Sequence, residues 1–237
     1  MTEEPYRWLE AIGNRREYIQ EQMKGGTPVF AASRPEGILL LGVGQGQSKV
    51  FEIYDRHAFA ALGHPVDIER IRQAAIEAAH LEGFNRSAKD VTLRRLISFA
   101  LSTTLKNSFE QIFSPPFIVE SIFAELGEAP RQDVLVRVNY DGNHRYEAGG
   151  ILVAANDRKK EEEATAWLHR ALKETDSVTR VVGLCLTVWQ ALAEDKTIAD
   201  LPVPEKPPAS IAGKTVEVAL LDRKLTGPVH YRALELK

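Results

Sequence analysis

A threonine that follows two glycines is the residue of this sequence with the clearest capacity for chemistry. Thr27 comes directly after Gly25 and Gly26, and an apolar run that predicts a β-strand starts there. A threonine can act as an amino-terminal nucleophile when cleavage frees its amine to serve as base and a lysine tunes the hydroxyl. Cleavage between Gly26 and Thr27 would create that amine. The other interpretation is that Thr27 merely begins the first strand.

Other patterns that could support chemistry are weaker. The glycine-rich run at residues 42–46 is typical of a phosphate-binding loop, but such a loop must open onto a helix. Residues 49–54 predict a strand, so we expect the glycines to form a flexible hairpin connection. The six histidines lack metal-ligand spacing, and we expect neither a metal nor a cofactor. Cys185 lies among apolar residues, which indicates a buried thiol, and a lone cysteine excludes an internal disulfide.

Composition narrows the class of protein. The 237 residues include 30 Lys and Arg against 33 Asp and Glu, a formal net charge of −3. A dedicated nucleic-acid binder normally has a basic surplus, so we expect no nucleic-acid partner. The longest apolar stretches, such as residues 181–189, are far shorter than the roughly 20 residues of a membrane span. The first residues do not resemble a secretory signal, and we expect a cytoplasmic protein without a membrane partner.

The pattern of apolar residues predicts an amphipathic helix at the start of the chain. Its apolar stripe is formed by Trp8, Ile12, Ile19 and Met23. Charged residues fill much of the remaining surface, and the glycines at 25 and 26 provide a stop. A stripe of this kind at a chain terminus needs something to cover it.

The remaining chain alternates blocks of strands with pairs of helices. Four strands in two hairpins are predicted at residues 28–33, 37–43, 49–54 and 57–62. Two helices follow at 66–83 and from about 90 to 113, the second after a Ser87-x-x-Asp90 capping signal. A second block has strands at 117–126, 133–140 and 151–154, followed by helices at 157–174 and 176–193. A proline-rich connector at 201–212 leads to a final strand at 215–221.

This order predicts an α+β protein with the architecture of an αββα sandwich. Helix pairs between strand blocks disfavour a doubly wound sheet, which needs single crossover helices. Two sheets face to face, each covered by a helix pair, would bury every apolar face. We expect one domain over residues 1–237, with a leading segment and helix (1–26), a core (27–200), the connector (201–212) and C-terminal strands (213–237).

Six sequence stretches, spread in order over nearly the whole chain, resemble those of a known protein family. They are residues 15–27, 36–41, 48–56, 59–63, 140–142 and 215–223. They resemble the leading helix and the successive strands of the proteasome family, most closely its bacterial α-type subunits. The fold that this resemblance implies, that of the N-terminal nucleophile hydrolases, is the αββα sandwich.

The proteasome family has catalytic β-type and non-catalytic α-type subunits, and the resemblance bears on both. Thr27 falls at the position of the β-type nucleophile, and Lys49 falls at the position of its lysine. The position of the catalytic aspartate, however, lies near Val43, and Pro28 directly after the threonine is unusual for a nucleophile. The patterned leading helix, which α-type subunits keep, favours the α-type. The alternative is a β-type threonine peptidase that exposes Thr27 by self-cleavage after Gly26; a scaffold without a partner protease is a third possibility.

An α-type identity implies a set of partners and no catalytic residue. The chain would form a ring of seven α subunits that caps rings of β-type subunits and admits only unfolded proteins. Residues 1–7 would form the gate, and the ring-assembly residues Trp8, Ile12, Ile19 and Met23 would pack against neighbouring helices. The resemblance implies that Lys49 pairs with the C-terminal carboxylate of a ring-shaped ATPase activator. The other interpretation of Lys49 is a solvated lysine at the start of a strand.

Overall fold

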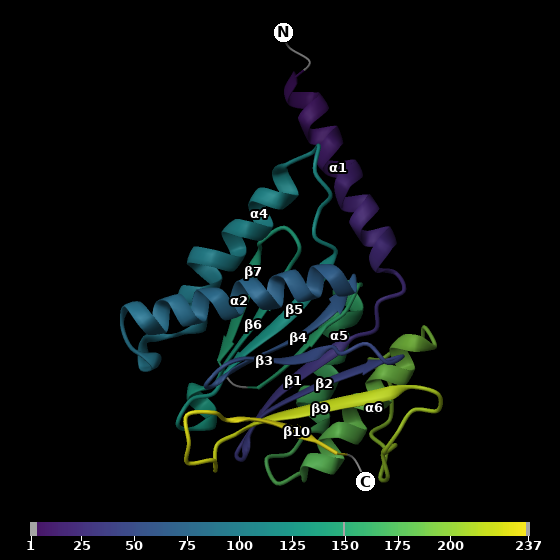
Figure 1. The fold of residues 1–237 in the computed structure, drawn as a ribbon. Helices are drawn as coiled ribbons and strands as arrows, with labels where there is room; N and C mark the ends of the chain where they lie inside the picture. The colour runs from purple at the N-terminus through teal and green to yellow at the C-terminus, as the bar shows by residue number, and fades with distance from the viewer. Residues whose placement is uncertain (1–3, 149, 236–237) are drawn as a thin grey trace.

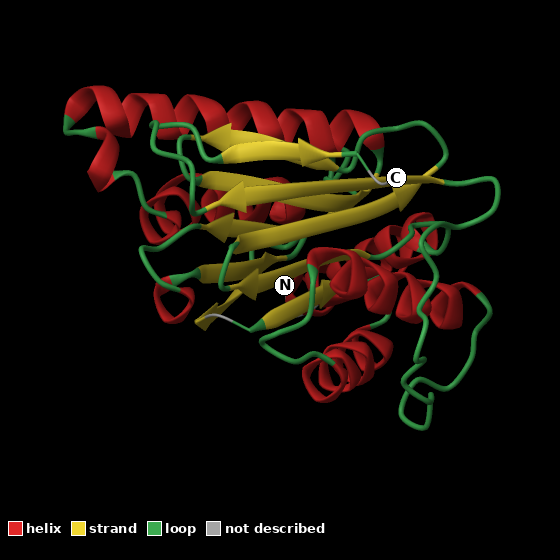
Figure 2. Cartoon of the chain, turned by 90° about the horizontal axis from the view of Figure 1, so that it is seen from below, coloured by secondary structure: helices red, strands yellow, loops and turns green. Residues whose placement is uncertain are grey.

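The computed structural model describes residues 4–148 and 150–235, which form two antiparallel sheets stacked face to face between helices (Figures 1 and 2). The αββα sandwich predicted from the sequence is confirmed. The first sheet has the order β10-β9-β2-β1-β8. Its strands are β1 (Val29–Arg34), β2 (Gly37–Gly44), β8 (Ile151–Ala154), β9 (Thr215–Asp222) and β10 (Tyr231–Leu234).

The second sheet has the order β3-β4-β5-β6-β7. Its strands are β3 (Val50–Tyr54), β4 (His57–Gly63), β5 (Val119–Glu125), β6 (Val134–Val138) and β7 (His144–Ala148). The longer helices are α1 (Glu4–Met23), α2 (Pro65–Asn85), α4 (Ser102–Glu110), α5 (Arg158–Ala171) and α6 (Val178–Ala193). Four short segments complete the structure: the 3₁₀ turns η1 (Ala88–Asp90) and η3 (Pro130–Gln132), one turn of α-helix, α3 (Leu93–Arg95), and the π-helical η2 (Leu96–Leu101).

Three apolar layers hold the sandwich together. Between the sheets, alternate residues of β1, β2, β4, β5 and β9 pack on one another. The other face of the first sheet packs on α5 and α6, where Trp167 and Cys185 are buried. The outer face of the second sheet packs on α2 and on the helical segments from α3 to α4, around Phe59 and Phe123. Within the described residues, no helix has the length and apolar character needed to cross a membrane.

The helix predicted from about residue 90 to 113 is broken into several pieces, and the predicted cap is wrong. The hydroxyl of Ser87 binds the side chain of Asp90 at 2.8 Å instead of a helix amide. Thr92 caps the helix instead, because its side chain accepts the Arg95 N–H. The next segment, η2, is π-helical, with main-chain hydrogen bonds between residues five apart. Its residues Leu96, Ile97 and Leu101 are buried, and Phe99 is three-quarters exposed.

Two strands had no predicted range, β7 and the C-terminal β10. β7 pairs with β6 at the edge of the second sheet, and its first two side chains are exposed. Its sequence, from His144 to Ala148, mixes charged and aromatic residues and lacks the apolar alternation that predicts a half-buried strand.

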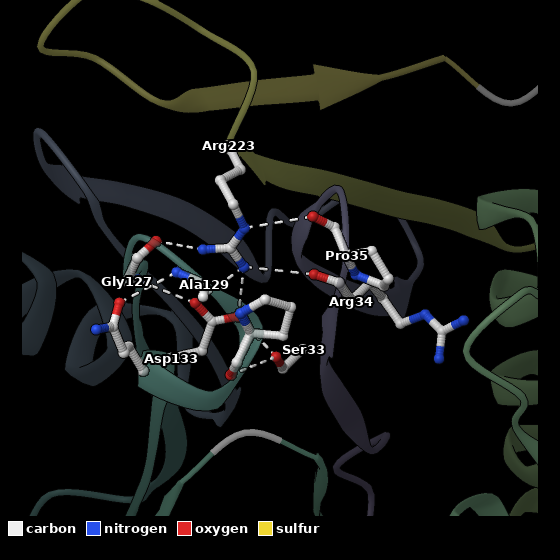
Figure 3. Close-up of polar contacts among 9 residues, drawn as sticks. Ser33, Arg34, Pro35, Gly127, Ala129, Asp133 and Arg223 are labelled. Carbon is white, nitrogen blue, oxygen red and sulfur yellow. Dashed lines mark hydrogen bonds and ion pairs between the residues drawn. The ribbon is translucent and has the colours of Figure 1, made fainter.

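A buried ion pair ties the first sheet to the second (Figure 3). Asp133, which is fully buried, accepts hydrogen bonds from the Ser33 hydroxyl (2.6 Å) and the Gly127 amide (2.9 Å). Arg223, just after β9, donates to both oxygens of the same carboxylate at 2.8 and 3.0 Å. The guanidinium also donates to the carbonyl oxygens of Gly127 and of Pro35 in the β1–β2 turn. Segments that are far apart in sequence therefore meet at one salt bridge.

A second buried cluster joins α5 to the second sheet. Arg137 of β6 lies 3.0 Å from Glu120 of β5 and 2.7 Å from Glu161 of α5. Burial raises the pKa of Glu120 to about 8, although the charge of Arg137 opposes that shift. Burial raises the pKa of Glu161 as well, and the Arg137 charge opposes that shift too, so the guanidinium lies between two carboxyl groups of raised pKa and joins β5, β6 and α5.

The chain between α6 and β9 packs along the outer helices. The Trp167 indole donates to the Leu201 carbonyl at 2.6 Å, and Arg180 donates to the Glu205 carbonyl at 3.0 Å. Gly183 of α6 makes room for the prolines, because a Cβ there would lie 2.8 Å from the ring of Pro207. This proline-rich stretch thus covers the outer face of α6.

Candidate functional site

The leading helix α1 is anchored to the body by its C-terminal half. Ile19 and Met23 are buried in the core between the two sheets, and α1 therefore closes one end of that core. Arg15 is also buried, and its guanidinium donates to the carbonyl oxygens of Ser108 in the last turn of α4 (2.8 Å) and of Ser114 just after that helix (2.7 Å). These contacts within one chain fix the direction of α1 relative to the two sheets.

The N-terminal half of α1 lies free of the sheets and rises above them (Figure 1). Trp8 is 47% exposed, the neighbouring Leu9 is 66% exposed, and Ile12 is half-buried. Trp8 and Ile12 line a cleft of about 630 Å³ between α1, α4 and the turn at residues 141–143. The stripe predicted from the sequence is therefore divided: Ile19 and Met23 are covered within the chain, and Trp8 remains accessible.

The chain after α1 brings Thr27 against the end of β2. The Gly26 amide donates to the Met23 carbonyl at 2.8 Å and ends the helix. A Cβ on Gly26 would lie 2.9 Å from a methyl group of Leu62 and 3.0 Å from the Met23 carbonyl oxygen, so the chain passes closely over β4 here. The hydroxyl of Thr27 then donates to the main-chain carbonyl of Val43 at 2.5 Å.

Lys49 reaches Thr27 from the other sheet. Its Nζ donates to the Thr27 carbonyl at 3.0 Å and to the Thr27 hydroxyl oxygen. The side chain crosses β2 at Gly42, where a Cβ would lie 2.8 Å from the Lys49 Cβ, and then passes Gly44, where a Cβ would be in ordinary contact with its Cε at 3.7 Å. Both glycines belong to β2, so the expectation of a flexible connection is wrong for them. Gly42 makes space for the lysine.

A glutamate of β9 completes the site. The Glu217 carboxylate accepts hydrogen bonds from the main-chain N–H groups of Lys49 (2.7 Å) and Val50 (3.3 Å), where β3 begins. Burial lowers the pKa of Lys49 to about 8, and the negative charge of Glu217 opposes that shift. Glu217 lies opposite Gly42 in the β2–β9 pair and so shares the inter-sheet side with the lysine.

The arrangement suits anion binding better than nucleophilic catalysis. A side-chain acid is missing where the resemblance places the catalytic aspartate, because Val43 is buried in the layer beneath α5 and α6. The nitrogen of Thr27 cannot act as a base while it remains in the peptide bond to Gly26. The Lys49 ammonium has three N–H bonds, of which Thr27 takes two, and the third can bind a carboxylate.

Sequence reasoning brought Thr27 and Lys49 together but missed two residues. Glu217 precedes Ala219 and Leu221, the apolar residues that β9 directs between the sheets, and an acid on that side of the strand was the available signal. The role of Arg15 could not be predicted from the sequence, because its partners are main-chain carbonyl groups about 95 residues away. The described residues contain no group of three His, Cys, Asp or Glu side chains that could hold a metal ion.

Comparison with known proteins decides the family. No protein-family model matches the chain. The chain is 30% identical over 216 residues to the proteasome subunit alpha of Streptomyces coelicolor, covering 90% of this chain and 79% of that protein. It is 31% identical to the one from Renibacterium salmoninarum, covering 90% and 82%, and 30% identical to the one from a Nocardioides species, covering 95% and 82%. The chain belongs to the proteasome α-subunit family.

Membership in the proteasome α-subunit family confirms the resemblance inferred from the six sequence stretches. Proteasome α subunits are generally non-catalytic. The matched relatives are bacterial and align with nine-tenths or more of this chain, so the likeness extends across both sheets and both helix layers.

Proposed function

We propose that this proteasome α-type chain forms the non-catalytic, gated ring through which unfolded proteins reach β-type subunits for ATP-dependent degradation in the cytoplasm. The observation that carries the proposal is the state of α1. Its C-terminal half is a packed element, held by Arg15 and Ile19, and a helix built into the core in this way is suited to be retained. A dispensable leader would have no need of such contacts.

The exposed end of α1 supports assembly with neighbouring copies. Trp8 and Leu9 present apolar surface at the free end of the helix, where a neighbouring α subunit could cover them. A head-to-tail contact of this kind closes into a ring by rotation, and we propose seven members. Residues 1–7 would form the gate at the axis; residues 1–3 lie outside the described part of the chain.

Lys49 is the proposed docking residue for a ring-shaped ATPase activator. Its ammonium is half-buried, held in place by Thr27, and has one N–H bond available for a C-terminal carboxylate. A charge-assisted hydrogen bond in a partly buried site is stronger than one in open water.

Binding through Lys49 should be lost in a lysine variant and at high pH. Lys49→Ala should weaken binding of the ATPase C-terminal octapeptide roughly 10- to 100-fold, the loss expected for about 1.5–3 kcal/mol of charged hydrogen bonding. Because the ammonium form binds, affinity should be full below the Lys49 pKa of about 8 and fall as the pH rises through it. Fluorescence anisotropy from pH 6.5 to 9.5 measures both effects.

The matched controls are the octapeptide as its C-terminal amide and the variant Lys89→Ala, at an exposed lysine on η1. The amide should bind as weakly to the native chain as the free acid binds to Lys49→Ala. Unchanged binding of the free acid to Lys49→Ala, in protein that still assembles, would overturn the docking role.

A β-type threonine peptidase is the second candidate, and one observation favours it. Lys49 contacts the Thr27 hydroxyl, as a lysine that tunes a nucleophile must. That function would require cleavage after Gly26 and removal of α1, whose buried residues would then leave the inter-sheet core open. The mass of the mature chain separates the two candidates.

A further inference from the structure

Glu217 is an acidic residue on the face of β9 that carries Ala219 and Leu221. Val216 and Val218 contact the layer beneath α5 and α6, whereas Ala219 and Leu221 belong to the core between the sheets. Because side chains alternate along a strand, Glu217 shares the inter-sheet side with Ala219. A half-buried carboxylate in that position needs partners, and it finds them in the main-chain amides of Lys49 and Val50.

We propose that Glu217 is a positioning residue for Lys49: it fixes the main chain at the start of β3 and supplies the negative charge that favours the ammonium form. This inference rests on the docking role proposed for Lys49. It assigns a second residue to that role, one that lies 168 positions after Lys49 in the sequence and holds it in place.

The positioning part of the inference follows from geometry. The two amides that Glu217 binds are consecutive, and the first is that of Lys49 itself, at 2.7 Å. From there the Lys49 side chain runs past Gly42 and Gly44 to Thr27, which its Nζ contacts. Holding the lysine main chain therefore fixes the place of the ammonium.

The electrostatic part follows from burial. An ammonium removed from water loses hydration, which disfavours its charge, and the pKa of Lys49 accordingly falls to about 8. Glu217 is the charged group that opposes the fall. Tyr231 of β10 also lies at this edge, its hydroxyl 3.4 Å from the Val50 carbonyl, but burial raises its pKa to about 12 and it stays neutral. The negative charges of Glu217 and of Glu52, the next acid along β3, also raise the pKa of Tyr231.

Two substitutions separate these two effects. In Glu217→Gln, an amide oxygen can still accept both main-chain hydrogen bonds, but the charge is gone. In Glu217→Ala, both the charge and the acceptor are gone. Asp222→Asn is a matched control, because it removes a charge from the same strand about 17 Å away along the chain.

The experiment is competitive acetylation of the full-length chain with trace acetic anhydride from pH 6 to 10, read at Lys49 by peptide mass spectrometry. Glu217→Gln should lower the titration midpoint of Lys49 by about one pH unit, the effect of losing a neighbouring opposite charge. Lys89, an exposed lysine, serves as internal reference and should not move. Asp222→Asn should leave the midpoint of Lys49 unchanged.

Amide hydrogen exchange reads the positioning effect. In Glu217→Ala, exchange at the Lys49 and Val50 amides should quicken at least tenfold, and in Glu217→Gln it should stay near the native rate. An unmoved Lys49 midpoint in Glu217→Gln, or unchanged exchange in Glu217→Ala, would overturn the inference. Neither readout involves an activator, so failure of Lys49→Ala to affect docking would overturn the proposed function and leave these results standing.

Discussion

Replacing Asp133 by alanine should lower the free energy of unfolding by about 3–5 kcal/mol, the cost of breaking one side of a buried ion pair. The carboxylate is fully buried and accepts from Ser33, Gly127 and Arg223. Alanine would leave the Arg223 guanidinium, whose side chain is only 15% exposed, without its counter-charge in the same place. Equilibrium urea unfolding followed by circular dichroism measures the loss.

An exposed ion pair provides the comparison. Glu162 of α5, whose side chain is 54% exposed, pairs with Arg158, and Glu162→Ala should change the unfolding free energy by about 0.5 kcal/mol or less. The double variant Asp133→Ala/Arg223→Met should recover part of the loss, because it removes the unpaired charge. A loss in Asp133→Ala no larger than that in Glu162→Ala would show that this salt bridge does not hold the sheets together.

Replacing Trp8 by alanine should prevent ring assembly while leaving the single chain folded. A buried interface tryptophan contributes about 2 kcal/mol or more by truncation, roughly a 30-fold weakening of each contact, and the loss recurs at every contact in a closed ring. Within one chain Trp8 is already 47% exposed, so its removal should cost about 1 kcal/mol or less of unfolding free energy. Native mass spectrometry reports the ring, and urea unfolding reports the chain.

Ile19→Ala is the counterpart on the same helix. Ile19 is fully buried between the sheets, so this variant should lose about 2–5 kcal/mol of unfolding free energy. The two substitutions are thus expected to show that the N-terminal half of α1 serves assembly and that its C-terminal half anchors the helix to the core. Rings of normal size and affinity formed by Trp8→Ala would refute the assembly role of that tryptophan.

The fold was predictable from sequence because periodicity marks nearly every element. The stripe from Trp8 to Met23 gave α1, and the two hairpins before α2 followed from short apolar runs separated by turn residues. The break at η2 was not predictable, because Leu96, Ile97 and Leu101 fit an α-helical pattern nearly as well as a π-helical one. β7 was missed because an edge strand needs no apolar alternation when it packs little.

The site was only partly predictable, because its contacts join distant parts of the chain. The resemblance aligned Thr27 and Lys49 with two residues of one catalytic site, and in the structure the two side chains are in contact. That Gly42 makes space for the lysine depends on how β2 lies against the start of β3, which local spacing does not contain. The partner of the Lys49 amide, Glu217, comes from the far end of the sequence and is fixed only by the β2–β9 pairing.

The intact mass of the purified full-length chain is the most direct test of the central claim that α1 is retained and Thr27 is not a nucleophile. The mass should correspond to a chain that starts at Met1 or Thr2, and it should stay unchanged after incubation with an electrophilic peptide. A chain that starts at Thr27, or a covalent adduct mapped to Thr27, would contradict the account and identify a threonine peptidase.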